Sequence, residues 1–189
     1  MFLFHLTDVC SYFENETLWI HFQTILYQKN MDVLKCKTLY GEEKEFPKAK
    51  FKFRPSVYAV IIRENNLLTV TSKRTNTLML PGGGIDIGEP IEKALIREVI
   101  EETGLEIEIV KFINFKESLF YYDPLDEAFH SFLFYYHCNA LTTQLKADSE
   151  VIDYECSTPQ WISLDTLKPE HFNNFGEAVL KTINMVVHP

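Results

Sequence analysis

Three glutamates and an arginine stand close together near the middle of the chain. Residues 97–102 read REVIEE, which places Glu98, Glu101 and Glu102 at positions i, i+3 and i+4. In a helix, which turns by about 100° per residue, these carboxylates project from one face. Carboxylates this close repel one another in a shielded site unless a hard divalent cation lies between them. Because oxygen ligands favour Mg²⁺ or Mn²⁺ over zinc, the spacing predicts a site that handles anions through a bound cation.

A pair of glutamates on a helix is usually no more than a solvated surface. Here the same face carries Ile91 and Ala94 one to two turns earlier, so the carboxylates continue a stripe that begins apolar. A solvated face would not usually show this pattern. A second apolar surface on the helix is formed by Leu95, Ile96, Val99 and Ile100. It predicts that the helix packs beneath a sheet.

The ends of this helix are marked in the sequence. Gly88 and Glu89 come at its start, and Pro90 falls in the first turn, where the missing N–H costs nothing. Gly104 provides a stop signal, because glycine readily adopts the left-handed conformation that closes a helix. The helix is therefore predicted to run from about Pro90 to Thr103.

A glycine-rich segment precedes the helix. Residues 80–84 read LPGGG and are predicted to break regular structure and to bring the backbone close to a ligand. Gly83 is followed after five residues by Glu89 and, after seven more, by residues 97–105, which read REVIEETGL. These positions make up a complete Nudix box, and the chain resembles the Nudix (MutT-like) hydrolase family.

The resemblance implies an α/β fold, an α/β/α sandwich with a mixed central sheet. It also implies a Mg²⁺-dependent hydrolase that cleaves the diphosphate of a nucleoside diphosphate linked to another moiety, by attack of metal-activated water on phosphorus. In such enzymes the arginine of the box orients its glutamates, which assigns this role to Arg97. Glu89 is then its partner, or a more distant metal or water contact. Gly83 would offer its backbone carbonyl to the metal beside the three carboxylates.

The general base is expected from one of two places. In the resembling family a base or further metal ligand often comes from a loop acid shortly before a Trp-containing strand. Glu155 lies six residues before Trp161 in an acidic loop and is the preferred candidate, although loop acids are normally just solvated. Glu102, acting directly from the helix, is the alternative.

Candidate substrate contacts lie on either side of the box. Lys73 and Arg74 end a predicted strand before the glycines and could reach phosphate, or could be ordinary strand-end cations. Tyr121 and Tyr122 follow Leu105 at a distance where family members that act on dinucleoside polyphosphates tend to carry a tyrosine. Tyr121 is taken as the candidate, although any ring here could stack on a base or fill the core.

The remaining pattern predicts a sheet flanked by helices. Residues 56–64 and 67–74 read as a hairpin around a turn at 64–66. Three further segments have strand character: 106–117, 129–141 and 160–167. Loops are expected at 121–128 and 142–159. Residues 171–187 fit an amphipathic helix with apolar positions 175, 179, 180 and 183. Strands before and after a central helix favour a mixed sheet.

The N-terminal part of the chain lies outside the resemblance. Residues 1–50 are interpreted as an extension or small subdomain, and residues 51–189 as the Nudix domain. Residues 21–28 fit either a helix or a strand, and residues 32–40 alternate weakly. The extension could form a small β subdomain or the contact of a homodimer.

Composition limits the partners. The chain has 189 residues, 46% of them hydrophobic, and a net charge of −9. This charge argues against broad binding to nucleic acid or to an anionic membrane, so a small-molecule nucleotide is the expected partner. Four cysteines without CxxC spacing are interpreted as free thiols in a reducing compartment. With no signal-like start and no membrane-length apolar run, a cytoplasmic protein is expected.

Three functions remain open at this point. The first is the active nucleoside-diphosphate-X hydrolase, and the second is a phosphohydrolase of non-nucleotide diphosphates. The third, from another class, is a regulatory module that senses a nucleotide without turnover. The intact carboxylate set of Glu98, Glu101 and Glu102 favours the enzymes, because a module that only binds need not keep a costly acidic cluster.

Overall fold

The computed structural model describes residues 20, 24, 32–151 and 155–188. Its strands are β1 (Val33–Thr38), β2 (Glu43–Pro47), β3 (Phe51–Arg63), β4 (Asn66–Ser72), β5 (Leu78–Met79), β6 (Gly82–Gly84), β7 (Ile107–Tyr122), β8 (Glu127–Ala140) and β9 (Cys156–Ser163). Within residues 32–151 and 155–188, the α-helices are α3 (Ile91–Thr103) and α4 (Gly176–Val187), and short 3-10 helices cover Lys48–Lys50, Asp123–Leu125, Asp148–Glu150, Leu164–Thr166 and Pro169–Phe175.

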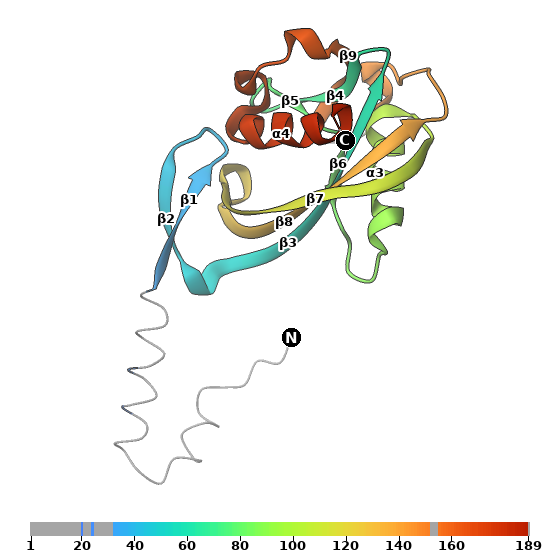
Figure 1. Cartoon of the computed structure of the whole chain (residues 1–189). Coiled ribbons are helices and arrows are strands. Elements are labelled where there is room, and N and C mark those ends of the chain that lie inside the picture. Colours follow the sequence, from blue (N-terminus) through green and yellow to red (C-terminus); the bar gives the residue numbers. More distant parts are fainter. Residues whose placement is uncertain (1–19, 21–23, 25–31, 152–154, 189) are drawn as a thin grey trace.

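The described strands form one curled, mixed sheet (Figure 1). Its main path runs β2-β1-β7-β8-β3-β4-β5, while β6 pairs with β3 and β9 pairs with β4. The centre is the parallel pair of β3 and β8, which stay in register from Phe51 opposite Ala128 to Ile61 opposite Cys138. The glycine strand β6 runs antiparallel to β3, with Gly83 opposite Val57. The mixed sheet predicted from the sequence is therefore confirmed.

The two helices cover opposite faces of the sheet, because side chains along a strand alternate between faces. Ala94, Leu95 and Val99 of α3 pack into one core with Val57 and Ala59 of β3. Val179 and Ile183 of α4 belong to a second core, which contains Val60 of β3, Leu67, Leu133 and Tyr135. Two cores separated by one sheet make the α/β/α sandwich.

Several predicted elements match the structure. The hairpin is confirmed as β3 and β4, joined at Glu64 and Asn65, whose φ values of 48° and 62° are those of a tight turn. The box helix begins one residue later than predicted, with Pro90 as its N-cap. It ends at Gly104, whose φ of 77° is left-handed.

Three expectations need correction. The glycine segment does not break regular structure, since residues 82–84 form β6 and pair with β3. Ile96 and Ile100 are exposed, so only Leu95 and Val99 of the predicted second apolar surface are buried. The strand β7 continues through Tyr121 and Tyr122, where the sequence predicts a loop, because the β7–β8 hairpin stays paired out to Tyr122 opposite Glu127.

The residues before β3 join the same sheet. β1 and β2 form a hairpin, and β1 pairs in parallel with β7 through Lys37 opposite Phe120 and Thr38 opposite Tyr121. The division into an extension and a Nudix domain stays a prediction. The segment 21–28, predicted as a helix or a strand, lies outside the described residues except for Thr24.

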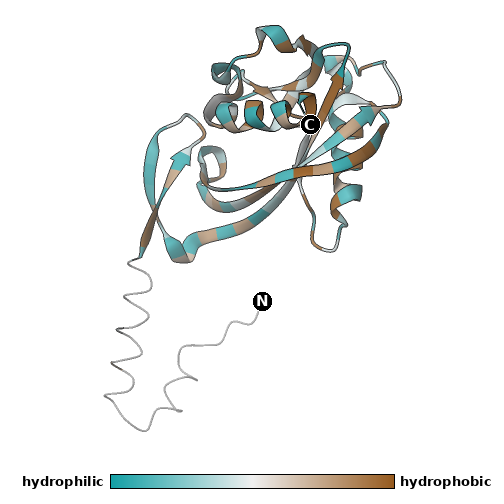
Figure 2. Cartoon of the chain, in the orientation of Figure 1, coloured by the Kyte–Doolittle hydropathy of each residue, from teal (hydrophilic) through white to brown (hydrophobic). Residues whose placement is uncertain are grey.

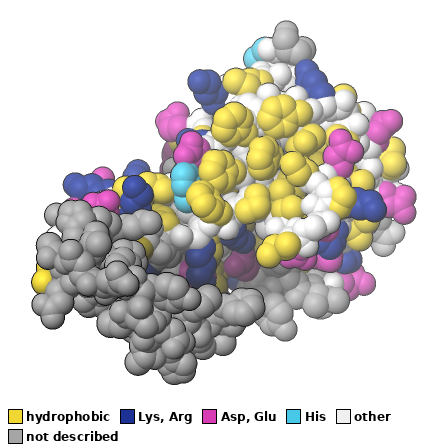
Figure 3. All heavy atoms as spheres, turned by 90° about the horizontal axis from the view of Figure 1, so that it is seen from below, with side chains coloured by type: hydrophobic (Ala, Val, Ile, Leu, Met, Phe, Trp, Pro, Cys, Tyr) yellow, Lys and Arg dark blue, Asp and Glu magenta, His cyan; other side chains and the backbone are white. Residues whose placement is uncertain are grey.

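The surface is mixed, and hydropathy alternates along the strands (Figure 2). Exposed aromatic side chains on the sheet include Phe53, Phe112 and Phe115. On the face seen in Figure 3, hydrophobic side chains gather. Of the helices in the described part of the chain, none combines the length and the apolar composition needed to cross a bilayer.

The cysteines that the structure describes are free and buried. They are Cys36, Cys138 and Cys156, whereas Cys10 lies outside the described residues. Burial raises the pKa of the Cys138 thiol to about 12, so this thiol stays protonated and inert at neutral pH.

Candidate active site

The glycine strand β6 lies directly against α3. The backbone N–H of Gly82 donates to Glu102 Oε2 at 2.8 Å. A Cβ placed on Gly83 would come within 2.7 Å of Glu98 Oε2, and one on Gly82 would come within 2.1 Å of the Val57 carbonyl oxygen. Only glycine therefore allows the strand to lie between β3 and the carboxylates of the helix.

Arg97 ties the acidic residues of the box together. Its Nε and Nη2 donate to the two carboxylate oxygens of Glu89, both at 2.9 Å, in a bidentate pair. Its Nη1 donates to Glu98 Oε1 at 2.8 Å and to Glu101 Oε2 at 3.3 Å. Nη2 also donates to the carbonyl oxygen of Gly84 at 3.2 Å. The guanidinium therefore links the helix to both the glycine strand and the loop before the helix.

These contacts have electrostatic consequences. The hydrogen bond from Arg97 lowers the pKa of Glu89 below its ordinary value, because it stabilises the ionised carboxylate. The hydrogen bond to Glu89, followed by that to Glu98, raises the pKa of Arg97 in turn, against the opposing effect of burial. The expected pairing of Arg97 with Glu89 is thus present in the structure.

The three helix carboxylates do not share one environment. Glu98 and Glu102 are buried, with Glu102 only 3% exposed, and both line a cavity beside β6. Glu101 does not line that cavity, and its side chain is 56% exposed beside Arg97. Glu102 also accepts a hydrogen bond from the Cys156 thiol at 3.1 Å. The structure thus separates Glu101 from the other two, whereas the helical spacing alone placed all three together.

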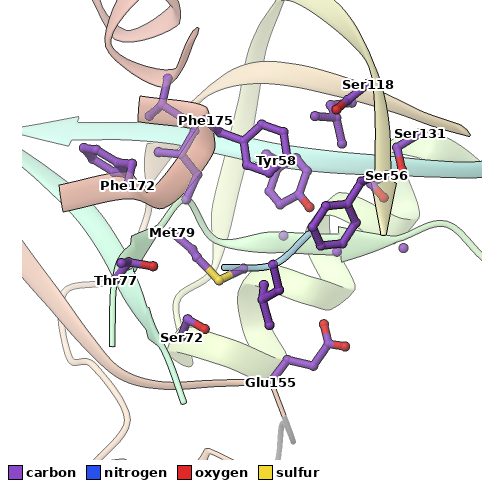
Figure 4. A pocket seen from close by; sticks show the side chains of 18 of the residues that line it. Ser56, Tyr58, Ser72, Thr77, Met79, Ser118, Ser131, Glu155, Phe172 and Phe175 are labelled. Carbon is purple, nitrogen blue, oxygen red and sulfur yellow. The ribbon is translucent and has the colours of Figure 1, made fainter. Parts of the chain in front are cut away.

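The cavity has a volume of about 310 Å³ and extends from the carboxylates across the sheet face that carries α4. Figure 4 shows side chains that line it from β3 (Ser56 and Tyr58), from β8 (Ser131) and from the segment before α4 (Phe172 and Phe175). Apolar rings and a few polar groups are the usual lining of a small-molecule site.

Three residues from distant segments meet at this cavity. Arg74 Nε donates to the Tyr122 hydroxyl oxygen at 2.9 Å, and the guanidinium carbon lies 5.6 Å from the ring centre. Burial, followed by the negative charge of Glu155, raises the pKa of Tyr122. Arg74, Tyr122 and Glu155 all line the cavity. The structure therefore brings two sequence candidates, Arg74 and Glu155, to the same place as Glu98 and Glu102.

Two sequence candidates lie elsewhere. Lys73 is exposed and does not line the cavity, although its backbone N–H donates to the Glu155 carbonyl oxygen at 2.9 Å. Tyr121 is buried on the opposite face of β7, in a cluster with Cys36 and Ala128. Tyr121 therefore does not line the cavity, contrary to expectation. Because side chains alternate along a strand, its neighbour Tyr122 faces the cavity instead.

The sequence interpretation missed most of the cavity floor. Arg54 and Ser56 on β3, Ser118 on β7 and Ser131 on β8 line it, as do the aromatic residues Phe120, Phe172 and Phe175. The period-2 alternation of residues 54–58 would have placed Arg54, Ser56 and Tyr58 on one face. Nothing in the sequence alone would have placed β7 and β8 beside them.

The donor set at the carboxylate end suits a hard cation. Glu98, Glu102 and Glu155 offer oxygen ligands only, which is the preference of Mg²⁺ and Mn²⁺. Within the described residues, no group of three or more His, Cys, Asp or Glu side chains is drawn together around one point. The carboxylates of Glu98 and Glu102 are instead hydrogen-bonded to Arg97, to Gly82 and to Cys156.

The chain belongs to the Nudix family, since residues 52–182 match the NUDIX domain. It is 27% identical over 124 residues to the NAD-capped RNA hydrolase NudC of Pseudomonas aeruginosa, covering 62% of this chain and 39% of that protein. It is 32% identical over 69 residues to the ADP-ribose pyrophosphatase of Methanocaldococcus jannaschii, covering 34% of this chain and 41% of that protein. The chain thus spans about two fifths of the length of these curated relatives.

Solved structures agree on the fold. The MutT NUDIX hydrolase from Burkholderia pseudomallei superimposes with a TM-score of 0.57 at 23% identity, over 70% of this chain and 98% of that one. At this identity the likeness concerns the fold, which is that of the α/β/α Nudix sandwich.

Proposed function

We propose that this protein is a Mg²⁺-dependent pyrophosphohydrolase that cleaves the diphosphate linkage of a nucleoside diphosphate joined to another moiety. The observation that carries the proposal is the position of Glu98 and Glu102 at one end of the cavity, held by Arg97 and by the glycine strand. The Nudix family acts on nucleotide-like substrates, and both curated relatives described above carry names of hydrolases or pyrophosphatases of nucleotide compounds.

Glu98 and Glu102 would hold the metal, with Glu155 as a further oxygen ligand or as the base. When bound, a divalent cation lowers the pKa of water and neutralises phosphate oxygens. Mn²⁺ offers the same ligand preference and is the alternative metal. Arg97 is assigned a positioning role, because its hydrogen bonds fix the orientation of the Glu98 carboxylate and of the box as a whole.

Of the two candidate bases, Glu155 is favoured. Glu102 is buried and is assigned to the metal, and its carboxylate also accepts hydrogen bonds from Gly82 N–H and from the Cys156 thiol. Glu155 lines the cavity and is exposed, so that water can reach it. An exposed carboxylate within reach of the reacting water is suited to accept its proton.

Arg74 and Tyr122 are proposed to meet the substrate at the edge of the cavity. A guanidinium can bind phosphate bidentately, and a tyrosine ring can stack on a base. Their mutual hydrogen bond at 2.9 Å fixes one relative to the other. A cytoplasmic location, a homodimer and the exclusion of nucleic acid or membrane partners remain predictions from the sequence.

The test is the release of phosphorylated products from ADP-ribose, dinucleoside polyphosphates, nucleotide sugars and nucleoside triphosphates with Mg²⁺, Mn²⁺ or chelator. Metal-dependent cleavage of one class supports the proposal and names the substrate group. If the protein cleaves none of these but does cleave diphosphates without a nucleoside, it is a phosphohydrolase of non-nucleotide substrates. Nucleotide binding without cleavage would contradict it in favour of a sensor.

A further inference from the structure

We infer that Arg54 and Ser56 form a phosphate-binding subsite. It lies on the α4 face of the sheet, across the strand β6 from the carboxylates of α3. This assignment rests on the proposed function, because its ligand is the second phosphoryl group of the same diphosphate. Both residues lie on β3 and line the cavity.

Ser56 carries a polar atom that the protein itself leaves unused. The residue is only 1% exposed, and its Oγ has no hydrogen-bond partner among the described residues. A buried hydroxyl without a partner costs free energy, so such groups in native structures call for an explanation. Figure 4 shows Ser56 among the side chains that surround the cavity, where a ligand oxygen could accept its hydrogen bond.

Arg54 supplies the charge beside this hydroxyl. It is two residues from Ser56 on the same strand, so both side chains emerge on the same face of β3. Its guanidinium nitrogens lie 3.8 and 3.9 Å from the point that a Cβ of Gly84 would occupy, and its Cζ lies 5.6 Å from the Phe129 ring centre. Among the residues that the structure describes, no carboxylate forms an ion pair with Arg54.

The glycine strand places this cation opposite the acidic side of the site. A Cβ on Gly83 would meet Glu98, whereas a Cβ on the next residue, Gly84, would be nearest Arg54. Successive residues of a strand point to opposite faces, so Glu98 and Arg54 lie on the two sides of β6. The missing glycine side chains leave the backbone accessible between them. A diphosphate that crosses this strand has one phosphoryl group at the carboxylates and the other at Arg54 and Ser56.

The ligand is anionic rather than a neutral sugar hydroxyl. Among the residues that line the cavity, the only basic side chains are Arg54 and Arg74, and Arg74 is already assigned to the substrate beside Tyr122. A guanidinium beside a hydroxyl donor offers hydrogen bonds that a phosphoryl group, which has only acceptor oxygens, can satisfy.

The experiment measures binding of methylenediphosphonate, a non-hydrolysable diphosphate, to the full chain by calorimetry in Mg²⁺. We expect Arg54→Gln to weaken binding by about tenfold or more and Ser56→Ala by about threefold to tenfold, because hydrogen bonds to charged groups are lost. Arg54→Lys should recover part of the affinity, since it keeps the charge but not the bidentate geometry.

Two surface substitutions provide matched controls. Arg63→Gln removes an arginine from the far end of the same strand, where it lies near Glu64, and Ser149→Ala removes an exposed hydroxyl. Both should bind within about twofold of the unchanged protein. The melting temperature of each variant checks that it is folded. If the Ser56 hydroxyl does not contact the ligand, Ser56→Ala should bind methylenediphosphonate as tightly as the unchanged protein.

The subsite is overturned if methylenediphosphonate does not bind the unchanged protein. It is also overturned if Arg54→Gln and Ser56→Ala bind it as tightly as the controls. The proposed function fails separately, when the unchanged protein hydrolyses no diphosphate of the panel. A protein that hydrolyses nucleotide diphosphates with the same KM after Arg54→Gln keeps its function and loses only this subsite.

Discussion

The two sides of the glycine strand differ in how the chain builds them. On the α3 side, the hydrogen bonds described for Glu98 and Glu102 come from Arg97 and Gly82, within one stretch of about twenty residues, and from Cys156. On the α4 side, the floor of the cavity is assembled from residues of β3, β7 and β8, with Arg74 and Phe175 from other segments. The carboxylates of α3 are thus held mainly by neighbours in sequence, whereas Glu155 and the floor of the cavity come from distant segments.

The largest expected effect separates the buried carboxylates from the exposed one. Glu102→Gln keeps the side-chain volume but removes the charge at the cavity, so turnover should fall by about 10²-fold or more, equivalent to about 3 kcal/mol of transition-state stabilisation. Glu101→Gln alters a carboxylate outside the cavity and should cost about tenfold or less. Initial rates at saturating Mg²⁺ measure both. Equal losses of turnover in the two variants would indicate that Glu101 also binds the metal, as the helical spacing predicts.

The second effect tests the close approach of strand and helix. In Gly83→Ala, the new Cβ would lie 2.7 Å from Glu98 Oε2 and displace that carboxylate, so turnover should fall by about tenfold or more. The melting temperature should change little, because a side-chain end can move at low cost. Gly84→Ala, whose nearest neighbour is Arg54 at 3.8 Å, should cost less. A larger loss of turnover in Gly84→Ala than in Gly83→Ala would contradict the assignment of Gly83 to the side of the strand that faces Glu98.

A third prediction concerns the base. Glu155→Gln should slow turnover and flatten the fall of the rate at acid pH, because the variant lacks the carboxylate that accepts the proton of water. The pH profile of kcat/KM, compared with that of Glu150→Gln, measures this effect. Glu150 is the control, because it is an exposed acid in the preceding loop and does not line the cavity. An unchanged profile would move the base to Glu102.

The smallest effect concerns stability at acid pH. The pKa of Glu89 is lowered in the folded protein, so its ionised form stabilises the fold at pH values above its ordinary pKa of 4.5. This contribution is lost as the pH falls through the lowered value. Glu89→Gln should therefore reduce the urea midpoint at about pH 7, and the difference from the unchanged protein should shrink as the pH falls below the ordinary pKa of 4.5. A difference that persists at acid pH would contradict a charge-based role.

The same contrast explains what could be predicted from the sequence. The box helix and its partner pair, Arg97 with Glu89, could be predicted because helical periodicity and capping signals act over a few residues. The strand β6 was missed because three glycines carry no strand pattern, and it exists only through pairing with β3. The sequence predicts a loop at Tyr121 and Tyr122, and a loop has no strand alternation to decide which of the two rings faces the cavity, whereas β7 continues through both.

The cavity floor depends on register, which local patterns do not determine. Arg54, Ser131 and Ser118 form one row only because β3 pairs with β8 at Arg54 opposite Ser131, and β8 pairs with β7 at Ser131 opposite Ser118. The parallel pairing of β3 with β8 joins residues about 77 positions apart. Single-sequence reasoning has no signal for that pairing, so Arg54 and Ser56 could not be connected with the carboxylates.

The most direct test of the central claim compares the unchanged protein with Glu102→Gln on the diphosphate panel, each with Mg²⁺ and with chelator. The account predicts metal-dependent release of a nucleoside monophosphate by the unchanged protein and a loss of about 10²-fold or more in Glu102→Gln, with both proteins equally folded by melting temperature. Cleavage that persists with chelator, or that is unchanged in Glu102→Gln, would contradict a carboxylate-held metal as the source of activity.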